Sequence, residues 1–577
     1  MNSIKLLLVS VFGPFGVRDD YAEGTGMQME LLNNQITRQQ GVHSPRQSYW
    51  SFPLYLLAEN VSVPATVLDF PTWEEFTREL EKGYTHVGIT FIVPNILKAR
   101  RMAEHIRSKH PEMKIILGGF GTMVPALETV VPHDGVCEGE GVEWLRRYFG
   151  EDPSAPIVHP ALFGPAYEYI YGARTPTKGS ILLTGVGCNN ACEFCATSFK
   201  YGNEYVPFMS TGAQVFDACL KSEKELGSRG FTIIDENFLK KPQRARELLA
   251  RLEAQGKAYV FDIFSSAEVI TDVGIDFLVR LGVHMIWIGV ESKANTHAKL
   301  KDIDIGRLIA QLQENGISVI TSGILFLDHH DRAAIREDID WIVGLGSDMT
   351  QFMNYTHSPC TGLYARLAGE GRLKDIHFRF HHGAGELNWN HPHIGDPKEQ
   401  ANLLKKAFRR KYEASGPGIL NMAITAVRGY AKAEADRTWR EAESFIWNPE
   451  SLRYEKSDHA ADDVFMRQRI RRLQKIALNL RPILLPALLF APNRAARRKA
   501  WNTIGLYREV LGRARPGVIL KGVFLVVTGF MEQIKLWFRR AGGYEDIVYQ
   551  PPSRSVEYRI PRAGSVKSSS PALAIIG

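Results

Sequence analysis

The stretch Gly185-Val-Gly-Cys188-Asn-Asn-Ala-Cys192-Glu-Phe-Cys195 decides the fold, because it places three of the chain's six cysteines within eight residues. It directly follows the apolar run Ser180-Ile-Leu-Leu-Thr184, so we expect a buried strand to deliver three soft ligands into one loop. Three thiolates at this spacing can hold one face of an iron–sulfur cube. The fourth iron would then lack a protein ligand and be open to chemistry.

Two other interpretations of these cysteines remain open, a structural zinc knuckle and a chance cluster in a loop. Zinc in a structural site prefers four protein ligands, and neither Cys nor His occurs soon after Cys195. Cys137 and Cys219 are interpreted as packing residues. Cys360 is a candidate for an additional thiol in the active-site pocket.

The cysteine triplet resembles the C-x-x-x-C-x-aromatic-C signature of the radical S-adenosylmethionine (SAM) superfamily, which Cys188, Cys192, Phe194 and Cys195 match. The resemblance implies a 4Fe–4S cluster ligated by these cysteines and SAM bound at the open iron. It further implies cleavage of SAM to methionine and a 5′-deoxyadenosyl radical, which abstracts hydrogen from an unactivated carbon. A donor such as a flavodoxin or ferredoxin would supply the electron.

Length and composition limit the class of protein. The 577 residues suggest about three or four units, and 45% hydrophobic with 23% charged residues is typical of globular chains. A net charge of +7 does not imply nucleic acid as a partner. The cysteine usage favours a reducing, cytoplasmic compartment. The N-terminus is interpreted as a first strand, not a signal peptide, and no run reaches the ~18 apolar residues of a membrane span.

Residues 1–150 alternate strand and helix patterns, which predicts an α/β, doubly wound, Rossmann-like domain. Ligands in such sheets bind outside the carboxyl ends of the strands. The loops at these ends are Phe12–Gly16, Phe91–Asn95, Gly118–Thr122 and Cys137–Glu143. The expected strands are Ile4–Val11, Ala65–Leu68, His86–Thr90 and Lys114–Leu117, and the expected helices are Ser51–Asn60, Thr72–Lys82, Ile96–His110 and Val142–Tyr148.

Two of these loops resemble the cobalamin-binding domain of cobalamin-dependent radical SAM enzymes. The resemblance implies cofactor contacts from Gly118, Gly119, Gly121, Thr122, Gly139, Glu140 and Gly141. Val142 before Glu143 departs from the family's Gly-Glu-Gly-Glu ending. The alternative is that these glycines turn a strand into a helix in another nucleotide or flavin binder. Asp-x-His-x-x-Gly is absent from residues 1–150, so cobalamin is expected without a His lower ligand, and His133 is interpreted as a loop residue.

The Pro- and Gly-rich residues 151–177 are interpreted as a linker. From 178 to 365 six strand–helix repeats predict a partial (β/α)6 barrel of the TIM type, with its active site at the carboxyl ends of the strands. The expected strands are Ser180–Thr184, Phe231–Asp235, Tyr259–Phe264, Met285–Val290, Ser318–Leu325 and Thr350–Tyr355, with helices at Gly212–Leu226 and Gln243–Gln255.

Several of these strand ends are polar, and in the radical SAM superfamily the corresponding ends hold SAM. The resemblance therefore implies that the cofactor is bound by Asp235, Glu236, Asn237, Ser266, Glu291 and Ser292. Glu291 and Ser292 match a Gly-Val-Glu-Ser motif. Each could instead cap a helix, and for Ser265 and Ser266 the two interpretations are equally supported.

Residues 366–560 are expected to form a mainly helical substrate or lid region, and 561–577 a disordered tail. The segment His357–Tyr364 resembles one in the group of magnesium-protoporphyrin ester cyclase and hopanoid methylases, with altered order. His391 and His393 face substrate or cofactor, or are ordinary loop histidines. Apolar runs edged with basic residues over 467–540 favour either peripheral contact with the inner face of the membrane or a helical lid with a solvated basic face.

Together these features favour a cobalamin-dependent radical SAM methyltransferase that acts on an unactivated carbon of a hydrophobic, lipid-like or polycyclic substrate. One alternative keeps the cofactors but performs cyclisation or rearrangement. Another is a non-catalytic iron–sulfur or cobalamin redox sensor, although a sensor gains nothing from an open iron. The sequence does not identify the substrate, because pocket shape is set by side chains that no motif locates.

Overall fold

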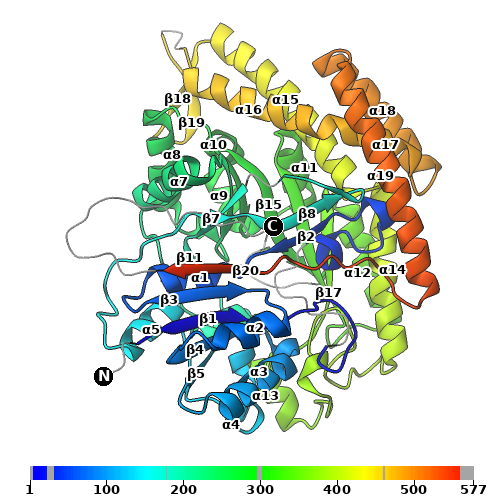
Figure 1. The fold of residues 1–577 in the computed structure, drawn as a ribbon. Helices are drawn as coiled ribbons and strands as arrows, with labels where there is room; N and C mark the ends of the chain where they lie inside the picture. Colours follow the sequence, from blue (N-terminus) through cyan, green and yellow to red (C-terminus); the bar gives the residue numbers. More distant parts are fainter. Residues whose placement is uncertain are drawn as a thin grey trace.

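The chain is organised around two sheets of mainly parallel strands, with helices packed on both and a helical region at the C-terminal side (Figure 1). The computed structural model describes residues 4–22, 32–176, 179–294, 300, 302–458 and 462–558. The expected disordered tail, 561–577, lies outside the described residues. The mixed α/β class predicted from the sequence is confirmed.

The first sheet has the strand order β20-β3-β1-β4-β5-β6, in which the five N-terminal strands are parallel. The helices α2 and α3 pack on one face, and α1 and α5 on the other. Thr72 and Glu75 form a capping box that starts α2. The elements are β1 Leu6–Ser10, α1 Phe52–Glu59, β3 Ala65–Asp69, α2 Trp73–Leu80, β4 His86–Thr90, α3 Ile96–Lys109, β5 Lys114–Gly118, α4 Leu127–Val130, β6 Gly135–Val136 and α5 Gly141–Tyr148. Every strand and helix predicted here is present.

The second sheet has the order β17-β16-β15-β14-β13-β10-β7, so its six parallel strands follow one another in chain order. One large apolar cluster joins these strands to the helices between them. The elements are β10 Gly179–Leu183, α6 Ala196–Lys200, α7 Gly212–Leu226, β13 Gly230–Ile234, α8 Pro242–Ala254, β14 Val260–Phe264, α9 Ala267–Val273, α10 Ile275–Leu281, β15 Val283–Glu291, α11 Ile305–Glu314, β16 Ser318–Leu325, α12 Arg332–Gly344, β17 Met349–Asn354 and α13 Gly362–Gly369. All six predicted strands are found.

The segment 151–177 is more than the linker that its Pro and Gly content suggested. β7 (Leu162–Phe163) pairs antiparallel with β10 and extends the second sheet. β8 (Pro165–Ile170) forms a third, antiparallel sheet with β2 (Arg46–Tyr49) and β9 (Ala173–Arg174). The pairing of β8 with β2 joins segments more than 100 residues apart, which local composition does not predict.

The C-terminal region is mainly helical, as expected, but it also contributes strands. β18 (Phe445–Asn448) and β19 (Arg453–Lys456) form a hairpin. β20 (Arg554–Tyr558) returns to the first sheet and pairs antiparallel with β3. The C-terminal side of the chain therefore completes the N-terminal sheet. The helices are α14 Pro397–Ser415, α15 Gly418–Ala442, α16 Val464–Leu480, α17 Leu484–Leu489, α18 Arg494–Leu511 and α19 Pro516–Ala541.

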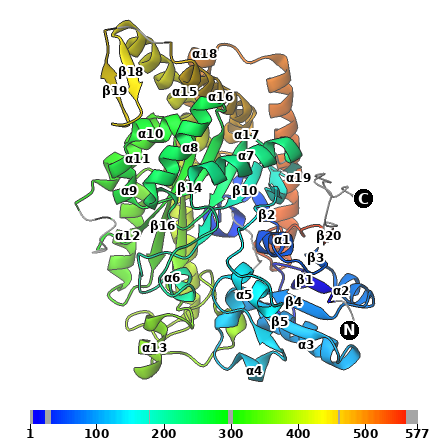
Figure 2. The ribbon, with the colours of Figure 1, turned by 90° about the vertical axis from the view of Figure 1, so that its left-hand side faces the viewer.

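The helix α19 contains the longer apolar run of the C-terminal region. Among the described residues, α19 is the one helix that is long and apolar enough, at 26 residues, to cross a membrane. Only 17% of its most apolar window is buried inside the protein. It runs along the outer edge of the molecule in both views (Figures 1 and 2).

Candidate functional site

The cysteine loop leaves the carboxyl end of β10 and leads into the short helix α6. A two-residue ladder holds its base, because β11 (Gly185–Val186) pairs antiparallel with β12 (Val206–Pro207). The Cys195 amide donates to the Cys192 carbonyl at 2.9 Å, which closes the second turn of the loop. The three thiols are free of disulfides and partly exposed. The loop thus presents three thiols with the backbone already folded around them.

The donor set of this loop fits an iron–sulfur cluster in its chemistry. The Asn190 amide donates to Cys188 Sγ at 3.5 Å, and hydrogen bonds to sulfur are among the features that tune such clusters. Desolvation raises the pKa of Cys188, although this amide and the Lys240 ammonium act in the opposite direction. The metal-free loop therefore holds a neutral thiol that must release its proton when a metal binds. Within the described ranges, no three His, Cys, Asp or Glu side chains are placed to hold a single metal ion.

Helix α6 brings the ends of several strands together. Lys200 Nζ donates to Thr122 Oγ1 at 3.0 Å, which joins α6 to the loop after β5 of the first sheet. Thr197 donates from its hydroxyl to the carboxylate of Glu236, at the end of β13. The carboxyl edges of both sheets therefore meet at the helix that directly follows Cys195.

The loop also touches the far strand of the second sheet. The rings of Phe194 and Tyr355 meet edge to face with centroids 6.4 Å apart, and Tyr355 directly follows β17. Cys360 Sγ lies 3.7 Å from the carbonyl oxygen of Ala196. This places Cys360 beside the cysteine loop, where the sequence predicted an additional thiol. The cysteine loop after β10 and the segment after β17 are therefore in contact.

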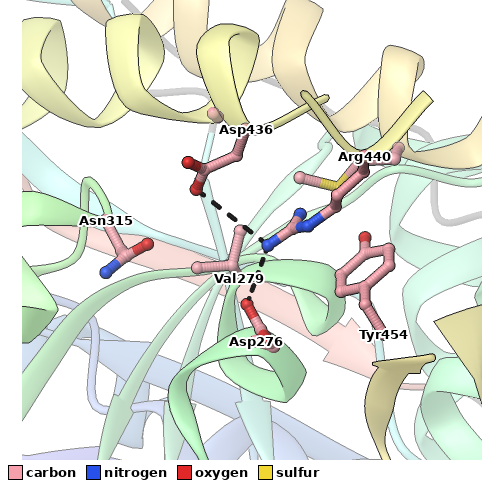
Figure 3. A pocket seen from close by; sticks show the side chains of 8 residues that line it. Asp276, Val279, Asn315, Asp436, Arg440 and Tyr454 are labelled. Atoms are coloured by element: carbon pink, nitrogen blue, oxygen red, sulfur yellow. Dashed lines mark hydrogen bonds and ion pairs between the residues drawn. The ribbon is translucent and has the colours of Figure 1, made fainter. Parts of the chain in front are cut away.

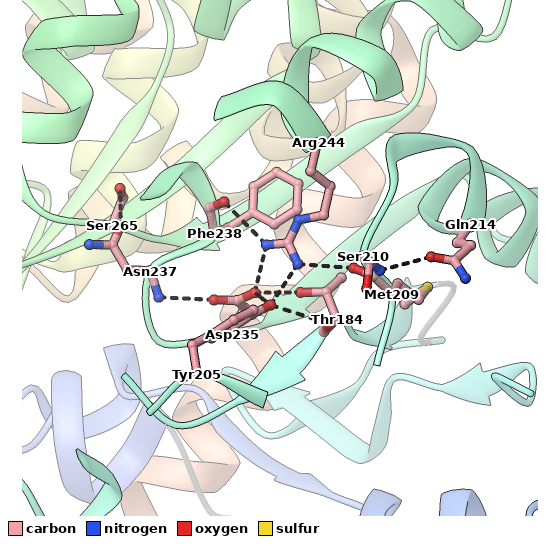
Figure 4. A network of polar contacts seen from close by, with 10 residues as sticks. All are labelled: Thr184, Tyr205, Met209, Ser210, Gln214, Asp235, Asn237, Phe238, Arg244 and Ser265. Atoms are coloured by element: carbon pink, nitrogen blue, oxygen red, sulfur yellow. Dashed lines mark hydrogen bonds and ion pairs between the residues drawn. The ribbon is translucent and has the colours of Figure 1, made fainter. Parts of the chain in front are cut away.

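Asp235 is the centre of an internal polar network (Figure 4). Its Oδ2 accepts from Thr184 and Tyr205 at 2.7 Å each and from Arg244 at 2.8 Å. Its Oδ1 accepts from the Asn237 amide at 3.0 Å. The side chains of Asp235 and Arg244 are almost completely inaccessible to solvent. The structure therefore gives Asp235 a positioning role: it ties the cysteine loop's strand to the end of β13.

Glu236, the next residue, is placed differently. Its side chain is exposed to solvent, yet desolvation by the surrounding protein, followed by the nearby Asp235 carboxylate, raises its pKa to about 7. The Glu236 carboxylate is therefore accessible to solvent although the surrounding protein partly desolvates it. Among the polar residues after β13, Glu236 is thus the one available to a ligand.

The other predicted SAM contacts are largely engaged within the protein. Asn237 donates to Ser266 Oγ at 2.7 Å and accepts from Ser265 Oγ at 2.8 Å. Ser266 lies at the N-cap position of α9, but its side chain makes no capping hydrogen bond and donates to Glu268 at 2.7 Å. These groups form a buried chain that links the ends of β13 and β14, so the capping alternative is wrong for Ser266.

Glu291 and Ser292 end β15 at a change of register against β16. Glu291 is buried and has a backbone φ of 54°, a value that is unusual for a residue with a side chain. Ser292 is bonded to Asp338, whose carboxylate also lies 3.1 Å from His330 Nε2. The strand end is thus held in an irregular conformation by α12.

The glycines of the first sheet divide into two groups. A methyl group added at Gly119 would lie 2.5 Å from the Phe91 carbonyl oxygen, and one at Gly121 would lie 2.2 Å from the Phe91 ring. Gly139 has open space beside it, and a methyl group at Gly118 would make only an ordinary contact with Cys137 Cβ at 4.0 Å. The first pair therefore serves close packing of the loop on β4, and only the second pair leaves room for a ligand beside the backbone.

Several residues have structural roles that the sequence left open. Glu140 caps α5, because its carboxylate accepts from the amides of Val142 and Glu143 at 2.6 and 2.7 Å. His133 Nδ1 lies 2.7 Å from the Val131 carbonyl, as a loop residue would. His391 is buried and bonded to backbone atoms on both ring nitrogens, which supports the loop alternative for it. His393 is exposed.

One surface hollow lies far from these groups (Figure 3). It is lined by residues of α10, α15, α16 and β19, and Arg440 in it contacts Asp276 at 3.1 Å and Asp436 at 4.0 Å. α10 ends just before β15 begins, so the hollow lies at the amino ends of the strands. Its single basic side chain is paired with both of its acids, and we assign the hollow no catalytic role.

The sequence did not predict the residues that join the cysteine loop, the Asp235 network and the first sheet to one another. Lys240, Tyr205 and Arg244 contact the cysteine loop or the network beneath it, and Lys200 joins α6 to Thr122 of the first sheet, but none of the four was predicted. Only the position of Lys200, at the end of the first helix after the cysteines, could have indicated its role. Tyr205 and Arg244 carry no local pattern that separates them from ordinary surface residues.

Comparison with known proteins shows only distant similarity to solved structures. No protein-family model matches the chain, and no curated protein matches it. Two solved structures of the radical S-adenosylmethionine methyltransferase TsrM from Kitasatospora setae show partial similarity, one with cobalamin and a 4Fe–4S cluster bound and one with tryptophan substrate and the SAM analogue aza-SAM bound. Both are 16% identical over 64% of this chain, covering 75% and 77% of the other chain, with TM-scores of 0.44 and 0.45.

Proposed function

We propose that the protein is a radical SAM enzyme whose cluster is held by Cys188, Cys192 and Cys195. The observation that carries the proposal is the disulfide-free three-thiol loop after the carboxyl end of β10, joined through α6 to the ends of β5 and β13. A zinc knuckle requires a fourth ligand and does not require this convergence of strand ends. Once bound, a 4Fe–4S cluster would supply the electron that cleaves SAM.

The chain's own residues would then bind and orient SAM. We assign the cationic end of SAM to Glu236, because its carboxylate is exposed and lies beside α6, whereas the Asp235 carboxylate has no free oxygen. A positive charge placed there would favour the ionised carboxylate. Asn237, Ser266, Glu291 and Ser292 would act by fixing the strand ends around the ligand.

We further propose that the second sheet curls into a partial (β/α)6 barrel. Its six parallel strands follow chain order, and residues after its first and last parallel strands touch through Phe194, Tyr355 and Cys360. The curled sheet would surround the substrate with the carboxyl ends of its strands.

For the first sheet we propose a cobalamin platform facing the cluster. Gly118 and Gly139 offer the open backbone positions, and Thr122 is fixed by Lys200 from α6. Methylcobalamin bound there would supply a methyl group for an unactivated carbon of a hydrophobic substrate. The chain's contribution would be to hold the two cofactor sites on opposite sides of α6.

Anaerobic reconstitution with iron and sulfide, followed by reduction in the presence of SAM, tests the proposal. The wild-type protein should release methionine and 5′-deoxyadenosine, and Cys192→Ala should release none. Cys219→Ala is the matched control, since this thiol is buried in α7 and away from the loop. Wild-type protein that takes up a cluster yet never cleaves SAM would overturn the enzymatic assignment.

The cobalamin part has its own test. Protein expressed with cobalamin should keep a corrinoid absorbance after desalting, and Gly118→Leu should lose it without losing the cluster. Comparison of metabolites from cells with and without the protein would then show whether the product carries an additional methyl group or a new ring. An electron donor of the flavodoxin or ferredoxin type is proposed for the cell.

A further inference from the structure

The helix α19 exposes a continuous apolar stripe to solvent. Its ten large apolar residues on this stripe are between 46% and 69% exposed. They recur at helical spacing over about 28 Å of helix, and monomeric proteins rarely leave so long an apolar surface uncovered. The residues are Ile519, Leu520, Val523, Phe524, Val527, Phe530, Met531, Ile534, Trp537 and Phe538.

The opposite side of α19 is fixed to the body of the protein. Gly522, Gly529, Glu532 and Leu536 are buried there. A methyl group at Gly529 would lie 2.8 Å from the Phe490 ring, so the helix backbone packs closely on α17. Glu532 accepts from Tyr549 at 2.9 Å and lies 4.0 Å from the buried Arg46. A helix anchored by a buried charge in this way lies along the protein and does not leave it as an independent span.

The charges around the stripe have one sign. Residues 513–541 contain six basic residues and a single acid, Glu532, which is the buried anchor. Trp537 follows Lys535 and precedes Arg539 and Arg540 near the end of the helix. Basic side chains and an exposed Trp beside an apolar stripe complement a bilayer surface that contains anionic lipids.

The other basic clusters of the C-terminal region include exposed arginines such as Arg471 and Arg498, but some of their cations are bound to the protein body. Arg469 is buried and donates to the carbonyls of Tyr259 and Leu281. Lys499 donates to Ser415 O at 2.9 Å and to Asn421 Oδ1 at 2.6 Å. These two cations help to hold α16 and α18 on the body. Within 467–540 the continuous exposed apolar stripe lies on α19, which we therefore take as the candidate membrane-facing element.

We propose that α19 is a monotopic membrane-binding element that lies flat on a bilayer containing anionic lipids. Its apolar stripe would enter the region between headgroups and acyl chains, while the basic residues at its edges would contact lipid phosphates. The buried side of the helix would keep the protein body at the surface. This proposal does not depend on which cofactors the protein binds.

Flotation of the full-length protein with vesicles tests the proposal. Wild-type protein should float with vesicles of phosphatidylcholine and phosphatidylglycerol, and much less with phosphatidylcholine alone or in 0.5 M salt. Phe524→Glu combined with Phe530→Glu should reduce the bound fraction at least tenfold. Val158→Glu is the control, because Val158 is 51% exposed but lies outside α19. Circular dichroism and thermal melting should show that all variants are folded.

A second measurement tests the proposal even if the double variant does not fold. Brominated lipids should quench the tryptophan fluorescence of the wild-type protein, and Trp537→Phe should remove most of that quenching. Three results would overturn the proposal: flotation that is unchanged in the double variant, bound protein that resists extraction at alkaline pH as a spanning helix does, or a dimer in solution that Phe524→Glu dissociates and that does not bind vesicles.

Discussion

The cysteine loop and the Asp235 network lie at adjacent strand ends of the second sheet, yet their polar groups are used in opposite ways. The three thiols are partly exposed and free of disulfides, whereas both oxygens of Asp235 are bonded within the protein. Glu236 resembles the thiols and not Asp235, because its side chain remains exposed. Binding and positioning are thus separated between residues one or a few positions apart.

This difference shows how far a strand-end motif specifies function. Asp235, Glu236 and Asn237 match one family motif, but the structure makes two of the three internal and leaves one available. The available groups are those that a ligand would have to satisfy. The internal groups hold β10, β13 and β14 in a fixed arrangement beneath the loop.

The largest expected effect is at the cysteine loop. Cys192→Ala should abolish binding of iron and sulfide, because two remaining thiols cannot hold three irons of a cube. Cys219→Ala should keep the full iron content, since its thiol is buried outside the loop. Iron and sulfide analysis with visible absorbance after anaerobic reconstitution measures both variants. Equal iron content in the two would show that the loop is not the cluster site.

The next largest effect is expected at the network. Arg244→Met should lower the free energy of unfolding by about 3–5 kcal/mol, because it leaves the buried Asp235 carboxylate without its cation. Arg100→Met breaks an exposed pair with Glu104 and should cost less than about 1 kcal/mol. Urea denaturation of the metal-free proteins makes the comparison. A loss at Arg244 no larger than that at Arg100 would remove the positioning role.

A smaller effect is expected at the packing glycine Gly121. Gly121→Ala should lower the free energy of unfolding by about 1–3 kcal/mol, because the new methyl group would overlap the Phe91 ring. Gly230→Ala should change it by less than about 0.5 kcal/mol, since space around that glycine is open. Thermal or urea unfolding distinguishes them. Equal stability of the two variants would mean that Gly121 is not a packing glycine.

The smallest effect is a pH dependence at Glu236. Its folded-state pKa of about 7 lies above that of an unfolded glutamate, so its contribution to stability is complete below the unfolded pKa and is lost as pH rises through the folded pKa. Glu236→Gln removes this loss. The melting temperature of metal-free Glu236→Gln relative to wild type should therefore rise between pH 5 and pH 8. A constant difference would show that the carboxylate titrates normally.

The sequence predicted the elements of both sheets well because their patterns are local. Buried strands such as β16 and helices such as α7 were located to the residue, since apolar periodicity and a capping box at Thr211 and Gln214 mark them. Of the site, the cysteine loop, Glu236 and the neighbouring Cys360 were identified from motif and position.

What the sequence did not predict depends on partners distant in the chain. The segment that includes Ile36 packs on Ile320 and Met349 of the second sheet, and Gln35 bonds Gln351 at 3.2 Å. β20 joins the first sheet after nearly 500 residues. Such contacts form when distant segments pack together, and neither the hydrophobic periodicity nor a motif of one segment identifies the other.

The central claim is that the cysteine loop holds a cluster with one iron open to SAM, and electron paramagnetic resonance tests it most directly. The reconstituted protein, reduced under anaerobic conditions, should give the signal of a reduced 4Fe–4S cluster, and addition of SAM should shift that signal because SAM binds the open iron. Cys192→Ala should give no such signal. A cluster signal that saturating SAM leaves unchanged, or zinc in place of iron in the loop, would contradict the claim.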